Sequence, residues 1–195
     1  TVSDVDGVHL DAAEHQTFGK AMADSVAGLL GSVPKPAGAL TAPDPNAPEP
    51  PMTFDRAVPP DWVDYNGHMN EAHYLTVFSD ATDQLLDWAG MDADCVAEGF
   101  SVFTVETHIR HLGEVNIGDQ IRVETRVLEG GDRKLHVWHE LFVGDALCAT
   151  GEQMLLHVDL ATRRPAPPRG DVADWLAAAK TAHCDLPLPD GLGRH

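Results

Sequence analysis

The order of its periodic segments is the feature that most constrains how this chain can fold. Residues 70–89 carry apolar side chains at three- and four-residue spacing, which is typical of a helix with one buried face. Alternating apolar and polar residues, typical of strands, follow at 101–112, 120–128, 134–143 and 146–159, and a short strand at 52–58 precedes the helix. Glycine turns at 130–131 and 144–145 favour antiparallel neighbours. The sequence predicts an α+β fold in which an antiparallel five-stranded sheet wraps around one long central helix.

Less regular segments flank this core. Residues 1–33 contain a helical pattern and are expected to form an N-terminal helical arm. Nine of the 14 prolines lie between residues 34 and 60, so residues 34–51 are expected to be a Pro-rich linker. The core domain is expected to span 52–164, and 165–195 to form a C-terminal helix and tail.

Composition excludes several classes of partner. The formal net charge is −18, which disfavours nucleic acid as a ligand. No apolar run approaches the roughly 20 residues needed to cross a membrane, and the acidic start does not resemble a secretory signal, so a cytoplasmic protein is expected. Three widely spaced cysteines predict neither a disulfide framework nor a zinc site. His136 and His139 would face opposite sides of a strand, so no metal is expected there.

The segment from Trp62 to Tyr74 has the layout of a catalytic site. Asp64 is followed by a tight turn around Gly67 and then by Asn70, a residue well suited to cap a helix. The backbone N–H groups of the first helical turn have no partners within the helix, and the helix dipole is positive there. We therefore expect an oxyanion site close to the Asp64 carboxylate.

The strand order and the segment Asp-Tyr-Asn-Gly-His-Met-Asn-Glu-Ala-His-Tyr (64–74) resemble the hot-dog-fold acyl-CoA thioesterases of the 4-hydroxybenzoyl-CoA thioesterase type. The resemblance covers roughly residues 52–164. It implies that Asp64 is the catalytic carboxylate and that the Glu71 amide polarises the thioester carbonyl. It also implies that Arg133 and Lys134 bind the phosphates of coenzyme A, with Arg163 and Arg164 as a weaker match to another such contact.

Four blocks more closely resemble betainyl-CoA thioesterases, which occur alone or fused behind L-carnitine dehydrogenase. They are Asp-Tyr-Asn-Gly-His-Met (64–69), Phe-Ser-Asp-Ala-Thr-Asp (78–83), Val-Glu-Thr-His-Ile-Arg-His-Leu (105–112) and Glu-Gln-Met-Leu-Leu-His-Val-Asp (152–159). This resemblance implies a small acyl-CoA as substrate, a place in carnitine metabolism, and a homodimer or homotetramer with the site between protomers. No cofactor is expected, because coenzyme A is part of the substrate. The resemblance leaves open whether a dehydrogenase is fused to this chain or associates with it.

Several roles stay open at this stage. An ordinary aspartate with a pKa near 3.9 is a weak base at neutral pH, so Asp64 fits nucleophilic attack better than water activation. His68 and Asn70 could orient water or the carbonyl, or could simply form the turn and cap. Trp62 and Tyr65 bracket Asp64 and are candidates to contact a trimethylammonium group.

Glu106 has two interpretations, of which an ion pair with Arg122 is preferred to a pocket position. The alternatives to betainyl-CoA hydrolysis are a thioesterase for another short or aromatic acyl-CoA, a hot-dog dehydratase or hydratase, and a non-catalytic acyl-CoA-binding domain.

Overall fold

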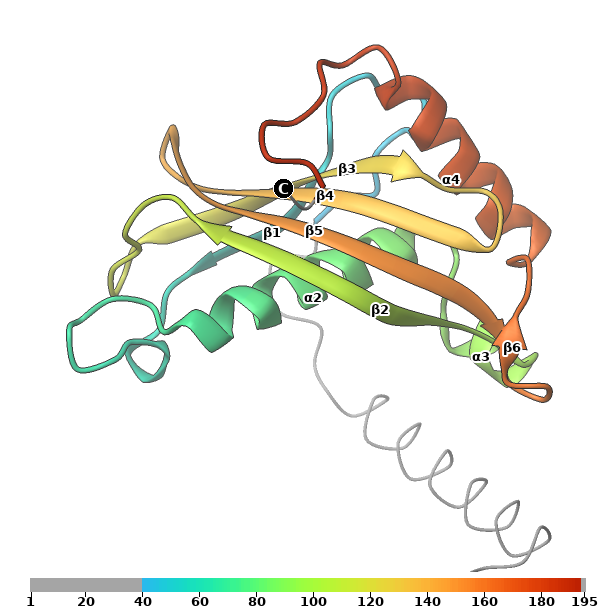
Figure 1. Ribbon diagram of the computed structural model, residues 1–195, viewed down its shortest axis with the longest axis horizontal. Coiled ribbons are helices and arrows are strands. Elements are labelled where there is room, and N and C mark those ends of the chain that lie inside the picture. Colours follow the sequence, from blue (N-terminus) through green and yellow to red (C-terminus); the bar gives the residue numbers. More distant parts are fainter. Residues whose placement is uncertain (1–39, 194–195) are drawn as a thin grey trace, which may run out of the picture. The chain divides into compact units, whose positions relative to one another are not determined.

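The computed structural model describes residues 40–193, in which an antiparallel sheet curls around one long helix (Figure 1). The elements are β1 (Met52–Ala57), η1 (Pro60–Trp62), α2 (Glu71–Trp88), α3 (Ala93–Ala97), β2 (Phe100–His111), β3 (Gln120–Glu129), β4 (Lys134–Val143), β5 (Ala146–Asp159), β6 (Arg164–Pro165) and α4 (Gly170–His183). The strand order is β1-β3-β4-β5-β2, with β6 added beside β5. The expected α+β class and antiparallel sheet are confirmed. The expected arm at 1–33 lies outside the described residues.

The sheet differs from the predicted five strands by the two-residue β6. The chain turns back after β5, where the carboxylate of Asp159 accepts hydrogen bonds from both the N–H and the hydroxyl of Thr162. Arg163 takes a positive φ of 55° in this turn. Val158 and Asp159 then pair with Pro165 and Arg164.

Local chemistry at both ends fixes the length of α2. Asn70 caps its start, with the side-chain oxygen accepting a hydrogen bond from the Ala72 N–H at 3.0 Å. At the other end the Met91 N–H bonds to the Leu86 carbonyl and the Gly90 N–H to the Asp87 carbonyl. Gly90 has a φ of +90°, which completes a Schellman motif. The predicted helix 70–89 is therefore confirmed to within a residue at each end.

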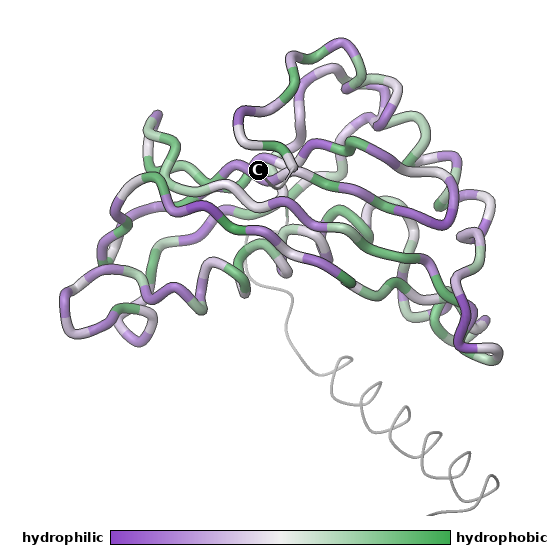
Figure 2. Tube along the Cα trace, in the orientation of Figure 1, coloured by the Kyte–Doolittle hydropathy of each residue, from purple (hydrophilic) through white to green (hydrophobic). Residues whose placement is uncertain are grey.

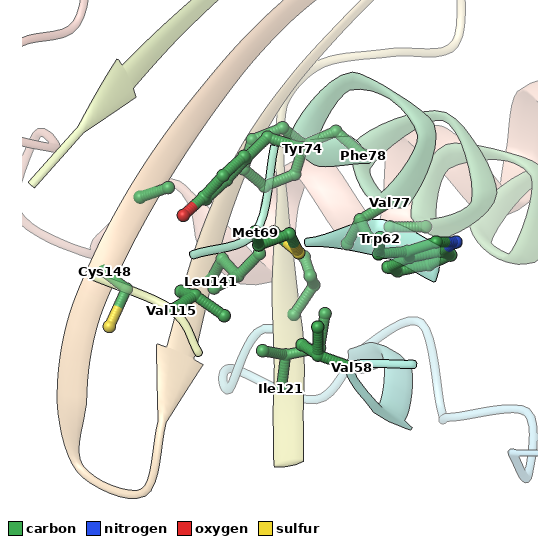
Figure 3. Packing of buried hydrophobic residues seen from close by; sticks show 13 residues of the cluster. Val58, Trp62, Met69, Tyr74, Val77, Phe78, Val115, Ile121, Leu141 and Cys148 are labelled. Carbon is green, nitrogen blue, oxygen red and sulfur yellow. The ribbon is translucent and has the colours of Figure 1, made fainter. Parts of the chain in front are cut away.

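The buried face of α2 packs against the inner face of the sheet. Figure 3 shows the core at the start of the helix, where Met69 and Tyr74 pack with Val115 and Leu141. The apolar and polar residues alternate along most strands, as Figure 2 shows. Contact between helix and sheet is close at Gly151, where an added Cβ would lie 2.6 Å from the Phe78 ring. A side chain at this position would therefore force the helix away from β5.

A line of buried polar side chains crosses the middle of this core. Thr82 of α2 donates a hydrogen bond to Gln153 at 2.6 Å, so its hydroxyl oxygen accepts from His139 Nε2 at 3.0 Å. The Nδ1 atom of His139 then accepts from Thr125 at 2.8 Å, and Thr125 contacts Thr53 at 2.6 Å. All five side chains are buried. The line joins α2 to four strands and requires a neutral His139 that carries its proton on Nε2.

Helix α4 covers the part of β3 that β1 leaves unpaired. β1 pairs with β3 only as far as Glu124. Beyond that point the Thr125 N–H bonds to the Pro51 carbonyl, and the Val127 N–H bonds to His183 Nδ1 on α4. The strand edge is thereby protected from pairing with another chain.

The predicted faces of β2 are only partly correct. Strict alternation along residues 101–112 would place Phe103, Val105, Thr107 and Ile109 on one face of the strand. The pairing of β2 with β5 instead slips at a bulge between Thr104 and Glu106. Phe103 is 50% exposed and Val105 is 55% exposed. The bulge adds one unpaired residue and so interrupts the two-residue alternation.

The buried His139 predicts a loss of stability in mild acid. Burial lowers the pKa of His139 to about 4, whereas an unfolded histidine titrates near 6.5. Between pH 6.5 and 4, His139 is therefore protonated in the unfolded state and neutral in the folded state. The free energy of unfolding falls as pH decreases through this range. Urea unfolding should give a free energy about 2 kcal/mol lower at pH 5 than at pH 7.5 from this residue. A His139→Gln variant should lose that part of the pH dependence; an unchanged pH dependence would contradict the assignment.

Candidate active site

The loop that carries Asp64 is a tight hairpin. Val63 and Met69 form a bridge, the Asp64 N–H bonds to the His68 carbonyl at 3.0 Å, and the Gly67 N–H returns to the Asp64 carbonyl at 3.0 Å. Gly67 has a φ of +83°, a conformation that strongly favours glycine. The turn predicted around Gly67 is therefore present, and the positive φ of this glycine shapes the loop.

The Asp64 carboxylate is held by one oxygen. Oδ1 accepts a hydrogen bond from the Asn66 N–H at 2.8 Å. Among residues 40–193 the structure gives Oδ2 no donor. The side chain is partly exposed and lines a pocket beside the start of α2. One carboxylate oxygen is thus fixed by the turn while the other is open to a ligand.

The start of α2 supplies a backbone donor to the pocket that this carboxylate lines. Glu71 is the first helical residue, so its N–H has no acceptor within the helix. The Asn70 side chain caps the N–H of Ala72 instead of that of Glu71. The Glu71 amide, at the positive end of the helix dipole, is suited to bind a developing negative charge.

Asp64 and the start of α2 line one open pocket of about 370 Å³. Its other wall comes from the end of β2 and the loop that follows. The lining residues are Asp64, His68, Met69, Asn70, Glu71, Tyr74, His111, Gly113, Glu114 and Val115. Four of the five predicted catalytic residues are thus brought together, and the fifth, Gly67, lies in the adjacent turn.

Residue spacing did not predict the part of the pocket lining that comes from Tyr74, from His111 and from the loop after β2. The Tyr74 ring meets His111 edge-on, with ring centroids 4.5 Å apart. Burial, with a smaller contribution from nearby Cys148, raises the pKa of Tyr74 to about 12, so its phenol stays protonated. The Met69 N–H bonds to the Val115 carbonyl at 2.7 Å, which ties the loop after β2 to the hairpin that carries Asp64. These neighbours depend on tertiary contacts that residue spacing does not encode.

Trp62 and Tyr65 lie outside the pocket lining. Trp62 is 9% exposed, and its ring stacks on His73 at 4.9 Å with the Arg56 guanidinium also 4.9 Å from the ring centre. Tyr65 is 96% exposed at the tip of the hairpin. Contact of either ring with an acyl group therefore stays a prediction.

The predicted phosphate-binding residues lie at the opposite end of the sheet. His111, at the pocket, pairs with Ala149, which pairs with Leu141 of β4. Lys134, at the far end of β4, is seven residues from Leu141, or roughly 23 Å along the strand. Arg133, Arg163 and Arg164 are exposed at that far end, where the His157 backbone bonds to the Arg133 carbonyl. Within a single chain, the Asp64 carboxylate therefore lies far from these cations.

The predicted ion pair between Glu106 and Arg122 is wrong. β4 and β5 lie between β2 and β3, and Arg122 instead contacts Glu124 at 3.3 Å and the Phe142 ring. Glu106 lines a separate cavity of about 200 Å³ with His108, His136, Glu152, Met154 and Gly193. Residue spacing does not encode strand order, which decides whether side chains of β2 and β3 can meet.

The two histidines of β4 lie on opposite faces of the sheet, as predicted. His136 contacts Glu152 at 2.9 Å, whereas His139 is fully buried. In residues 40–193 no group of three or more histidine, cysteine or acidic side chains is arranged to hold a metal ion. Across the same residues, every helix is too short or too polar to span a membrane.

The fold and site define a class of protein. The thioesterase-like superfamily model matches residues 58–176, more than half of the chain, and the chain belongs to this family. The arrangement of sheet and helix is the hot-dog fold. A candidate thioesterase from Pseudomonas putida KT2440 is 38% identical, with a TM-score of 0.65 over 75% of this chain and 95% of that one. A Staphylococcus aureus protein solved in complex with CoA has a TM-score of 0.70 at 23% identity, covering 75% and 95%.

Two relatives of similar sequence are named betainyl-CoA thioesterases, one of them as part of a fusion with L-carnitine dehydrogenase. A betainyl-CoA thioesterase from Pseudomonas aeruginosa is 45% identical over 146 residues, 73% of this chain and 91% of that protein. An L-carnitine dehydrogenase/betainyl-CoA thioesterase from Ruegeria pomeroyi is 49% identical over 145 residues. That match covers 74% of this chain, which spans only 30% of the length of the fused relative.

The Asn70 cap should contribute measurably to stability. Replacing Asn70 with alanine removes the acceptor for the Ala72 N–H, which should lower the free energy of unfolding by about 1 kcal/mol in urea titrations. Asn70→Asp keeps an acceptor at the same position and should remain within a few tenths of a kcal/mol of the wild type. Equal stability of the alanine variant would contradict the capping role.

Proposed function

We propose that this chain hydrolyses betainyl-CoA to betaine and coenzyme A. The observation that carries the proposal is the shared pocket of the Asp64 carboxylate and the Glu71 amide at the start of α2. Thioester hydrolysis needs a nucleophile or base on one side of the carbonyl and a donor for its oxygen on the other. The names of the 45% and 49% identical relatives support betainyl as the acyl group.

The chemistry begins with Asp64 as the nucleophile. Its free Oδ2 attacks the thioester carbon while the Glu71 N–H stabilises the negative charge that develops on the carbonyl oxygen. Collapse of this intermediate breaks the C–S bond, releases coenzyme A as the thiolate and leaves an anhydride between Asp64 and the acyl group. Water then hydrolyses the anhydride to betaine and regenerates the carboxylate. Water activation by Asp64 in a single step is the second route.

A second protomer would complete the substrate site. β2 is an edge strand, and its pairing with a two-fold related β2 would be antiparallel. That pairing sets the His111 end of one sheet near the Phe100 end of the other. Arg133 and Lys134 of one protomer would then approach the Asp64 pocket of its partner, where they would bind the phosphates of coenzyme A.

Loss of the Asp64 carboxylate should abolish turnover. In Asp64→Asn the side chain keeps its size but is a poor nucleophile and a poor base, so thiol release from betainyl-CoA should fall by about 10³-fold or more. Circular dichroism and urea unfolding of the same variant should match the wild type. Wild-type activity in a folded Asp64→Asn protein would contradict the proposal.

The two chemical routes can be separated with labelled water. In a single turnover in oxygen-18 water, the anhydride route leaves one labelled oxygen either in Asp64 or in betaine, according to which carbonyl carbon water attacks. Mass spectrometry of the Asp64 peptide after repeated turnovers should then show incorporated label. A labelled peptide would exclude direct water activation as the only route, whereas an unlabelled peptide would exclude water attack on the Asp64 carbonyl of an anhydride. Acetyl-CoA and 4-hydroxybenzoyl-CoA test the alternative substrates in the same thiol-release assay.

Removal of the Arg133 and Lys134 charges should weaken binding of coenzyme A without altering the chemistry. The double variant Arg133→Gln/Lys134→Gln should raise KM for betainyl-CoA by about tenfold at low salt, since two phosphate contacts are lost. Its kcat/KM for the N-acetylcysteamine thioester, which has no phosphates, should be unchanged. Lys180→Gln, which removes one exposed charge on α4, is the control for a general loss of positive charge. An unchanged KM in the double variant would show that these two residues do not bind the phosphates of coenzyme A.

A further inference from the structure

The pocket around Asp64 is acidic beyond the needs of the hydrolysis. Three of its ten lining residues are carboxylates, namely Asp64, Glu71 and Glu114, and none is lysine or arginine. Two of the three are already explained. Asp64 is the proposed nucleophile, and an acidic residue at the first position of a helix is favourable to the helix dipole. The Glu114 carboxylate has neither explanation.

Glu114 combines a fixed backbone with an open side chain. Its carbonyl lies 3.8 Å from the Cys148 thiol, the preceding Gly113 N–H bonds to the Cys148 carbonyl at 2.9 Å, and the next residue, Val115, is fully buried. The carboxylate itself is 76% exposed. Its basic neighbour is His68, with Nε2 3.7 Å from Oε2. The loop therefore presents a negative charge towards the pocket that no arginine or lysine of its lining neutralises.

We infer that Glu114 is a specificity-determining residue that selects a cationic acyl group. The inference rests on the proposed thioesterase function and concerns the same pocket. A quaternary ammonium one methylene from the thioester carbonyl must lie close to Asp64 whenever the carbonyl is in place to react. Glu114 lines the wall formed by the loop after β2, so its charge acts on that ammonium group. A neutral acyl group of the same shape receives no such attraction.

A matched pair of substrates isolates this charge effect. Betainyl-CoA and 3,3-dimethylbutanoyl-CoA have acyl groups of nearly the same shape, but carbon replaces the quaternary nitrogen in the second. For wild-type protein the ratio of kcat/KM values should favour betainyl-CoA. Glu114→Gln should lower this ratio about fivefold at low ionic strength, the equivalent of about 1 kcal/mol for an exposed charge pair. The fall should come from betainyl-CoA alone.

The control variant is Glu129→Gln, which changes the net charge equally at an exposed position near the end of β3. Its ratio should equal that of the wild type. Added salt should lower the wild-type ratio and change the Glu114→Gln ratio much less, a response that a purely structural role for Glu114 would not produce.

The outcomes separate this inference from the proposed function. A wild-type preference for betainyl-CoA that Glu114→Gln leaves intact would overturn the role of Glu114 while the thioesterase function stands. An equal loss on both substrates, or the same change in Glu129→Gln, would also overturn it. Failure of the wild-type protein to release thiol from either substrate would instead overturn the proposed function.

Discussion

The fixed position of the α2 N-terminus is the constraint on which the site depends. The Asn70 N–H bonds to the Trp62 carbonyl at 2.9 Å, and the Met69 N–H bonds to the Val115 carbonyl at 2.7 Å. These two bonds hold three segments together: the Asp64 hairpin, the first turn of the helix and the loop after β2. Because Met69 is itself buried, the junction is also part of the core. The carboxylate, the Glu71 amide and the Glu114 wall share one pocket for this reason.

The polar line in the core supports the same junction from a distance. Sliding α2 along the sheet by one turn would move its N-terminus by about 5.4 Å. An apolar core alone resists such a shift weakly, since hydrophobic contacts are not directional. The bonds from Thr82 to Gln153 and His139 would be broken by it, and each buried polar group left without a partner costs about 1–3 kcal/mol. The hydrogen bonds in the centre of the fold thus fix where the Glu71 amide lies.

Residue patterns predicted the elements well and the contacts between them poorly. Alternation located β3, β4 and β5 almost to the residue, because the two faces of those strands differ in burial. The Asp64, Asn70 and Glu71 cluster was predictable because turn, cap and helix start are encoded locally. The bulge in β2, the strand order that separates Glu106 from Arg122, and the shared pocket of Glu114 and Asp64 all depend on long-range pairing. Local spacing carries no signal for those features.

The central claim is that the acyl carbonyl binds between Asp64 and the start of α2. A crystal structure with a betainyl-CoA analogue in which a methylene replaces the thioester sulfur would test it most directly. We predict that the carbonyl oxygen accepts a hydrogen bond from the Glu71 N–H at about 2.9 Å, with an Asp64 oxygen against the carbonyl carbon. An analogue whose carbonyl binds away from the helix N-terminus, with Asp64 out of contact, would contradict the account.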